Sequence, residues 1–275
     1  MKIWITTCAT LTILLIFNIF GFSQNPIVIL HTNDTHSQLD PFIHRSEGEI
    51  GGVLRRYNFI NSVRAKNTHV LVLDAGDFSQ GTPFYNFFSG YAEIQLMNKM
   101  GYDVTTLGNH EFDKGSASLA KQLKKANFDV VCANYTFKNR RLARIVKSYT
   151  IIEIDQKRIG IFGLTTNLKG LVSPATEQEL IYKDPIATAK KMVQILKDKE
   201  HCDLIICLSH LGLDQIRVDD VSDKILADQV DGIDIIIGGH SHDYLSNPIE
   251  IKNKIIVQTG SKGAYMGKIE INLTK

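Results

Sequence analysis

Short apolar runs alternate with longer stretches of helical periodicity along most of the chain after Pro26. The runs are rich in β-branched residues and too short to be helices, so they predict buried strands at 27–30, 70–73, 104–107, 129–132, 204–208 and 233–237. Between them, apolar residues recur at the spacing of one helix face. This periodicity predicts helices at 51–66, 92–100, 116–126, 185–199 and 213–230.

Two segments break this alternation. Residues 150–154 and 158–164 are β-rich runs joined by Asp155-Gln156-Lys157, which predicts a hairpin and therefore antiparallel pairing. Residues 254–258 and 265–273 are again β-rich, with no helix between them. Two stretches of strand and helix alternation, each followed by a β-only segment, predict an α/β fold in which two mixed sheets pack face to face with helices outside. The sequence contains no repeat and no linker, so we expect one domain.

The N-terminus differs from the rest of the chain. Lys2 is followed by an apolar run from Ile3 to Phe22, and small residues stand at positions −3 and −1 of a cut after Ser23. This pattern predicts a secretory signal peptide over residues 1–23 and a periplasmic or secreted protein without a stable membrane anchor after cleavage. The alternative is an uncleaved anchor, because the run is close to the roughly 20 residues that span a bilayer.

Composition narrows the class of protein. The chain has 275 residues, 44% of them hydrophobic, and a net charge of +2, which argues neither for nor against an anionic ligand. Without the predicted signal peptide three cysteines remain, Cys132, Cys202 and Cys207, and no CxxC pair occurs. This count excludes a disulfide framework and a zinc-thiolate site. Cys132 and Cys207 lie in apolar runs and are expected to be buried. One short basic run, at 138–141, does not support nucleic-acid binding.

Polar side chains collect where five of the predicted strands end. The most concentrated stretch runs from Thr105 to Asp113 and packs an amide, an imidazole and two carboxylates after a glycine. Imidazole mixed with carboxylate and amide oxygen suits zinc, manganese, iron or another first-row dication, and does not suit calcium. Seven such side chains are too many for one tetrahedral ion, whereas two ions that share a bridging carboxylate can use them. They are Asp34, His36, Asp77, Asn109, His210, His240 and His242.

These blocks resemble the calcineurin-like metallophosphoesterase superfamily in order and spacing. They are Asp34-Thr35-His36, Gly76-Asp77, Gly108-Asn109-His110-Glu111, His210 and Gly239-His240-Ser241-His242. The flanking residues of the first three blocks, including 30–36, 76–83 and 108–113, resemble the bacterial and animal 5′-nucleotidase family. The similarity runs from about Ile27 to the C-terminus. It implies a four-layer α/β/β/α fold and a two-metal centre.

The resemblance also implies roles for single residues. Asp34, His36 and His242 would hold one ion, Asn109, His210 and His240 the other, and Asp77 would bridge them. His110 and Asp113 match the catalytic dyad of the family, and the spacing alone lets Asp113 orient the imidazole and favour its charged form. Some nucleotidases carry an amide where this chain has His242. The implied reaction is attack on phosphorus by a metal-bridging hydroxide, with His110 stabilising the developing charge or protonating the leaving oxygen.

We therefore expect a secreted or periplasmic hydrolase of phosphate monoesters, above all 5′-nucleotides. The resembled nucleotidases have a second, C-terminal domain that orients the nucleobase, and we expect residues 24–275 to be the catalytic domain without it. The chain is then either half of a split enzyme that needs a separate substrate-binding chain, or a stand-alone phosphoesterase, phosphodiesterase or cyclic nucleotide hydrolase of loose specificity. A non-catalytic metal-binding protein is a third alternative, which the complete set of motif residues disfavours.

Two roles have alternative interpretations from the sequence, that of the aromatic residues after Asp77 and that of Glu111. The aromatic residues Phe84, Tyr85, Phe87 and Phe88 follow Asp77 in the chain and serve either to stack on a substrate or to pack in a core or interface. Glu111 is either a participant in the reaction or a structural acceptor behind the site.

Overall fold

The computed structural model describes residues 25–273. The predicted signal peptide and its alternative, an uncleaved anchor, lie outside the described residues. Within residues 25–273, no helix combines the length and the hydrophobicity needed to cross a membrane.

The first sheet has five strands in the order β15-β1-β4-β5-β6. Its strands are β1 (Ile27–Thr32), β4 (His69–Asp74), β5 (Val104–Thr106), β6 (Asp129–Val131) and β15 (Gly267–Ile271). The first four run parallel, whereas β15 pairs antiparallel with β1 at the edge. Thr32 lies opposite Asp74 in the β1 and β4 pair, so these two strands end level with each other.

The second sheet has six strands in the order β13-β14-β12-β11-β9-β8. They are β8 (Tyr149–Ile154), β9 (Lys157–Thr165), β11 (Leu204–His210), β12 (Ile235–Gly238), β13 (Ile249–Ile251) and β14 (Lys254–Val257). The four central strands are parallel, and β8 and β13 pair antiparallel at the two edges. The β8 and β9 pair is the hairpin that the sequence predicted.

Alternation along β1 shows how the layers form. Ile27 and Ile29 face the second sheet, while Val28 and Leu30 face the helices on the other side. The first sheet is covered by α1 (Val53–Arg64), α3 (Tyr91–Met100), α4 (Ser116–Leu123) and α5 (Leu142–Ile145), and the second by α7 (Pro185–Gln194), its π-helical continuation η2 (Ile195–Lys199) and α8 (Asp223–Gln229).

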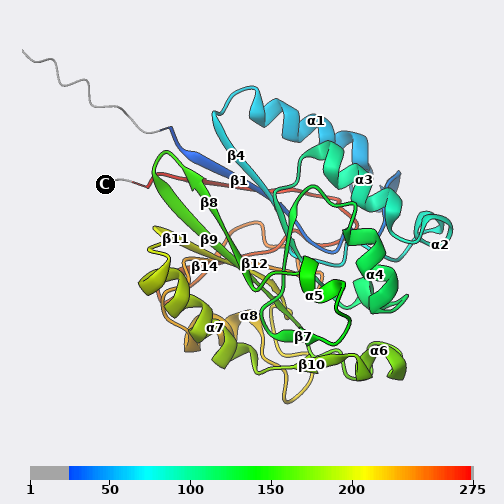
Figure 1. The fold of residues 1–275 in the computed structure, drawn as a ribbon. Helices are drawn as coiled ribbons and strands as arrows, with labels where there is room; N and C mark the ends of the chain where they lie inside the picture. Colours follow the sequence, from blue (N-terminus) through cyan, green and yellow to red (C-terminus); the bar gives the residue numbers. More distant parts are fainter. Residues whose placement is uncertain (1–24, 274–275) are drawn as a thin grey trace, which may run out of the picture.

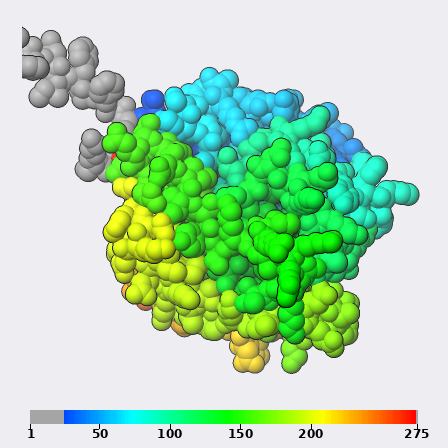
Figure 2. All heavy atoms as spheres, viewed as in Figure 1, coloured from blue at the N-terminus to red at the C-terminus, as the bar shows by residue number. Residues whose placement is uncertain are grey.

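The helical layers lie on opposite sides of the two sheets. Figure 1 shows α1 and α3 on one side of the molecule and α7 and α8 on the other, and the same cyan and yellow regions lie at opposite ends of the surface in Figure 2. The four-layer α/β/β/α fold with two mixed sheets is thus confirmed. Cys132 and Cys207 are buried free thiols, as expected.

The predicted helix at 213–230 is wrong over most of its length. Helix α8 begins only at Asp223, where the Ser222 side chain caps it by accepting a hydrogen bond from the Ile225 amide. Ile216 and Val218, which contributed apolar positions to the helical pattern, point into solvent instead. Residues 211–222 therefore form a loop that follows β11.

Several short elements were not predicted from the sequence. They are α5 and β13, whose bounds are given above, together with β2 (Pro41–His44), β3 (Gly48–Gly51), α2 (Pro83–Phe88), η1 (His110–Phe112), β7 (Tyr135–Phe137), α6 (Pro174–Gln178) and β10 (Leu180–Tyr182). Each is too short to show a clear periodicity. Helix α2 carries the four aromatic residues that follow Asp77 in the chain.

Candidate metal centre

The predicted ligands meet where the carboxyl ends of the strands in both sheets face each other. Asp34 and His36 follow β1, Asp77 follows β4 and Asn109 follows β5 in the first sheet. From the second sheet, His210 ends β11, and the loop after β12 carries His240 and His242. The two sheets pack face to face, so residues far apart in sequence come together at this edge.

Asp34, His36 and His242 form one group of side chains that could hold a metal ion. The Nε2 atoms of the two histidines lie 2.9 Å apart. Oδ1 of Asp34 lies 3.8 Å from Nε2 of His36 and 3.4 Å from Nε2 of His242. Three ligand atoms at such distances surround one point, as they would around a single cation.

Asp77, His210 and His240 form a second group, and Asp77 also belongs to a third with His36 and His110. Oδ2 of Asp77 lies 3.1 Å from Nε2 of His210. Nδ1 of His210 lies 2.7 Å from the carbonyl oxygen of Ala75 and donates to it, which directs Nε2 toward the site. Because Asp77 shares groups with residues from both sides, it occupies the position that a bridging ligand requires.

Three buried atoms of the predicted ligands satisfy no hydrogen bond of good geometry in the described structure. They are Oδ1 of Asn109, Nδ1 of His36 and Nε2 of His210, and the last has only Oδ2 of Asp77 beside it, at 3.1 Å. Buried polar atoms are nearly always paired, so unpaired ones need a physical reason. An amide oxygen and an imidazole nitrogen beside two carboxylates are a donor set that fits first-row divalent cations. The residues present therefore fit the predicted two-metal centre.

The charges of the site depend on its buried carboxylates. Burial disfavours the charged form of His210, but the charges of Asp77 and Asp34 outweigh it and raise the pKa of His210 to about 10. Burial, together with the charge of His210, lowers the pKa of His240 to about 4. A histidine must be neutral to bind a metal, so we expect metal binding to displace a proton from His210.

The backbone at the ligand positions is unusual. Asp34, His36, Asp77, His240 and His242 have φ angles of 49°, 47°, 55°, 75° and 58°. Such positive values are uncommon outside glycine, and they gather at functional sites where surrounding contacts maintain them. Here the amides of Asp34 and His36 each donate to the loop after β4, with distances of 2.9 Å to Gly76 and Asp77 carbonyl oxygens. These bonds lock two ligand loops together.

Two glycines allow the ligand loops to approach each other. A Cβ atom added at Gly108 would lie 2.1 Å from Oδ1 of Asp77, and one added at Gly239 would lie 3.0 Å from Oδ2 of Asp34. Any side chain at Gly108 would displace the carboxylate. The glycines in the motifs are thus required by close packing against the predicted ligands.

His110 and Asp113, the residues of the predicted dyad, are hydrogen-bonded to each other. Nδ1 of His110 lies 2.9 Å from Oδ2 of Asp113, and this hydrogen bond is the main cause of a raised pKa of His110. The backbone amide of His110 donates to Oδ1 of Asp77 at 2.9 Å. The centroid of the His110 ring lies 5.3 Å from the centroid of the His36 ring. Because the bond to Asp113 uses Nδ1, Nε2 is the ring nitrogen that can reach a substrate.

Glu111 has a structural role in the hydrogen-bond network. Its buried carboxyl group accepts from the amides of Asp77 at 2.9 Å, Ser79 at 3.0 Å and Gly108 at 2.7 Å. Burial, followed by the charge of Asp77, raises the pKa of Glu111 to about 8. These contacts agree with the second interpretation of Glu111, a structural acceptor that joins the loops after β4 and β5.

Asn33 contributes to the site but was not predicted. Its Nδ2 donates to Oδ2 of Asp34 and to the Gly260 carbonyl, each at 2.7 Å, while its Oδ1 accepts from the Thr259 amide at 2.8 Å. Asn33 therefore fixes the Asp34 carboxylate against the loop after β14. The available signal was its position directly before Asp34.

The aromatic residues after Asp77 separate into two environments. Tyr85 is buried, so core packing holds for it. Phe87 and Phe88 on α2 remain 82% and 53% exposed, which leaves substrate or interface contacts open to them.

Residues 27–244 match the family of calcineurin-like phosphoesterases. The chain therefore belongs to that family. It is similar to the snake venom 5′-nucleotidase of Crotalus adamanteus, with 36% identity over 80% of this chain and 37% of the relative.

Solved structures give the same result. The 5′-nucleotidase precursor of Thermus thermophilus has a TM-score of 0.81 and 33% identity, and covers 90% of this chain and 51% of that chain. The NAD nucleotidase of Haemophilus influenzae has a TM-score of 0.78 and 31% identity, over 89% of this chain and 47% of that chain. The chain thus spans about half the length of these proteins or less.

Proposed function

We propose that this protein is a metal-dependent phosphoesterase that hydrolyses phosphate monoesters, above all 5′-nucleotides. The observation that carries the proposal is two ligand groups, of which one contains Asp77 and the other contains His36, a residue that also clusters with Asp77 and His110, beside the hydrogen bond between His110 and Asp113. One ion would be held by Asp34, His36 and His242, the other by Asn109, His210 and His240, and Asp77 would bridge them. Membership of the phosphoesterase family and similarity to 5′-nucleotidases support the reaction class.

When bound, two divalent ions lower the pKa of a water between them and stabilise negative charge on a phosphoryl group. The chain supplies the rest. His110, charged through its bond to Asp113, stabilises the growing negative charge or gives a proton to the leaving oxygen. Asn33 and Glu111 keep the carboxylates of Asp34 and Asp77 in position.

The proposed setting is outside the cytoplasm, with residues 1–23 as a cleaved signal peptide and residues 24–275 as the catalytic domain. A second candidate is the catalytic half of a split nucleotidase. The nucleotidases compared are longer than the sequence given, which covers 37% to 51% of each of them. A separate chain would then supply the contacts to the nucleoside.

Parallel assays of the purified protein with Mn²⁺ or Zn²⁺ test both candidates. We would measure phosphate released from AMP and p-nitrophenolate released from bis-p-nitrophenyl phosphate. Efficient hydrolysis of AMP supports a nucleotidase that acts alone. Turnover of the aryl ester alone supports the split enzyme. If neither substrate is hydrolysed by protein that has bound metal, the proposal is wrong.

A further inference from the structure

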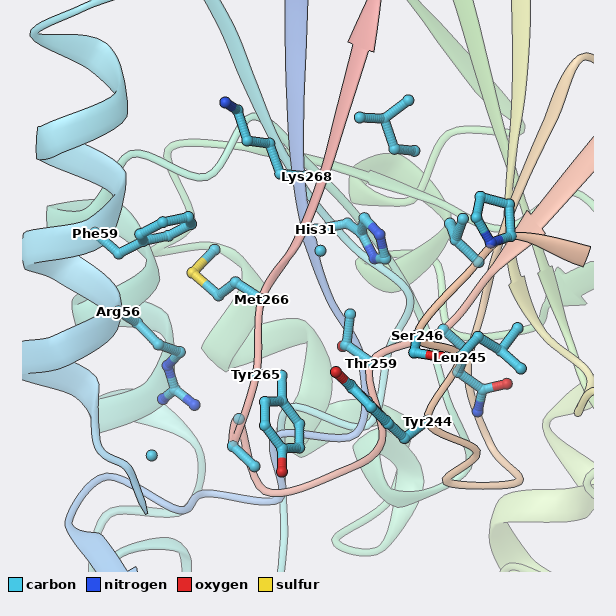
Figure 3. A pocket seen from close by; sticks show the side chains of 18 of the residues that line it. His31, Arg56, Phe59, Tyr244, Leu245, Ser246, Thr259, Tyr265, Met266 and Lys268 are labelled. Carbon is cyan, nitrogen blue, oxygen red and sulfur yellow. The ribbon is translucent and has the colours of Figure 1, made fainter. Parts of the chain in front are cut away.

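A cavity of about 680 Å³ lies beside the edge strand β15, away from the predicted metal ligands. It is bordered by α1, β14, the loop after β12 and the segment that leads into β15 (Figure 3). None of the seven predicted ligands is among the described residues that line it. Its volume falls within the roughly 300–1,000 Å³ that small-molecule sites usually have. The cavity is therefore large enough for a ligand of its own.

Two buried polar side chains point into this cavity without partners for all their polar atoms. Arg56 from α1 is 6% exposed, and His31 from β1 is 2% exposed. Nε and Nη1 of Arg56 and Nδ1 of His31 have no hydrogen-bond partner in the described structure. Figure 3 shows both side chains directed into the pocket. Buried donors without acceptors cost free energy, which an acceptor that reaches these covered atoms would recover.

The guanidinium group of Arg56 lies at the wall of the cavity. A Cβ atom added at Gly263, which lines the cavity, would lie 1.4 Å from Nη1 of Arg56, so the guanidinium packs directly against the cavity wall. Asp74 and Glu93 line a separate space of about 20 Å³ next to Arg56, with room for about one water. Arg56 lines this space as well, and no hydrogen bond joins its guanidinium to either carboxylate in the described structure.

Neighbouring basic residues are already paired. Arg55 lies 2.5 Å from Glu49, and Lys268 lies 2.5 Å from Glu270. These two exposed pairs are locally neutral, which leaves the guanidinium of Arg56 as the cation with open donors on this wall. A guanidinium with free N–H groups favours phosphate or carboxylate.

The opposite wall is aromatic. The rings of Tyr244 and Tyr265 lie 4.5 Å apart at 36°, and the Tyr265 hydroxyl donates to Glu47, which fixes the pair. Tyr244 is 55% exposed and keeps one face open. Phe59 from α1 and Met266 add apolar surface on the side of the cavity where Arg56 lies (Figure 3). A fixed ring with a free face is suited to stack on a planar group.

We propose that this cavity binds a small molecule that carries a phosphate or carboxylate on a planar apolar body. Arg56 binds the anionic group, Tyr244 stacks on the planar body, and His31 contributes a hydrogen bond. Burial lowers the pKa of His31 to about 4, so the imidazole is neutral at pH 7 and can bond to a neutral polar atom.

The cavity is joined to the metal centre through the backbone. Tyr244 stands two residues after His242, and the Gly260 amide donates to the Asp243 carbonyl at 2.8 Å. The Lys262 amide donates to the Asp34 carbonyl at 2.7 Å. The aromatic wall is therefore part of the same loops that carry predicted ligands, although the cavity is a separate site.

The test uses the purified, metal-loaded protein and a phosphonate analogue of AMP whose P–C bond resists hydrolysis. Equilibrium dialysis counts the bound analogue at saturation. We expect the Arg56→Met variant to bind one equivalent fewer than the wild type, or to bind that equivalent at least roughly tenfold more weakly, since a charge-assisted contact is lost. Arg55→Met is the matched control and should bind as the wild type does.

Further arms define the ligand. Adenosine and methylphosphonate each lack one half of the recognised chemistry and should leave the cavity unfilled at concentrations that saturate it with the analogue. Adenosine 5′-carboxylic acid separates a carboxylate ligand from a phosphate ligand. Tyr244→Ser changes an exposed side chain and should also weaken binding, which keeps the test valid if Arg56→Met fails to fold.

Equal numbers of bound analogue, bound with equal affinity, in the wild type, Arg56→Met and Tyr244→Ser would overturn this proposal. The result is independent of the proposed phosphoesterase activity. If the metal centre binds no nucleotide, the wild type and every variant each bind one equivalent of the analogue fewer. The difference in bound analogue between the wild type and Arg56→Met remains.

Discussion

Replacing Glu111 by glutamine tests whether the loops that carry the predicted ligands depend on one buried carboxyl group. Oε2 of Glu111 accepts from the amides of Asp77 and Gly108, and Oε1 accepts from the amide of Ser79. In the variant, the remaining oxygen can keep the first two bonds. Above its pKa of about 8, where Glu111 is ionised, the variant's NH₂ group replaces an acceptor with a donor, so two donors meet at the Ser79 amide and one backbone N–H loses its acceptor.

The loss of stability in Glu111→Gln follows from the one backbone N–H that is left without an acceptor. Leaving one buried donor unsatisfied costs about 1–3 kcal/mol, so we expect Glu111→Gln to lower the free energy of unfolding by about 2 kcal/mol. For a domain of this size, about 2 kcal/mol corresponds to a decrease in Tm of roughly 4–8 °C. The amides of Asp77 and Gly108 adjoin the predicted ligands, so metal should also bind more weakly.

Glu93→Gln is the matched control. Glu93 is also buried, at 3% exposure, but both of its carboxyl oxygens lack a hydrogen-bond partner in the described structure. Removing its charge therefore breaks no bond and should leave stability unchanged or increase it. Urea unfolding of the three proteins measures the difference. If Glu111→Gln is as stable as the wild type, or if both variants lose the same stability, the assigned role of Glu111 is wrong.

Three substitutions and one chelator treatment test the centre itself. Asp77→Asn should remove most bound metal and activity together, as measured by metal analysis and turnover, and retention of both would refute the bridging role. His110→Asn should lower turnover by roughly 10²- to 10⁴-fold with metal still bound, and a large loss of metal would instead identify His110 as a ligand. Gly108→Ala should reduce metal content, because the new Cβ would lie 2.1 Å from Oδ1 of Asp77; unchanged metal content would show that the loops can move apart. Treatment with a chelator should abolish hydrolysis, and added Mn²⁺ or Zn²⁺ should restore it.

The layer architecture could be predicted because the strands carry their signal in a few buried β-branched residues. Ile27 to Leu30 and Val70 to Leu73 are such runs, and both lie inside observed strands. The same reasoning wrongly predicted a helix over residues 213–222. Its apolar residues recur at helical spacing, but Ile216 and Val218 contact no core and point into solvent. Periodicity indicates a helix only when the apolar face has a surface to pack against.

The candidate site shows a similar limit. Asp34, His36, His240 and His242 could be selected because their side-chain chemistry is unusual at a strand end. Glu111 could be noticed in the motif, but its partners are backbone amides of two other loops, which no side-chain pattern encodes.

The environment of Arg56 could not be predicted from the sequence at all. In sequence it stands beside Arg55 on α1, and the two are the same residue type in the same helix. One turns outward to Glu49, while the other is buried against Gly263 with unpaired donors. The difference arises because β15 and the loop before it return to the edge of the first sheet, more than 200 residues later in the chain. Only the tertiary fold separates the residue that is proposed to bind a ligand from its neighbour.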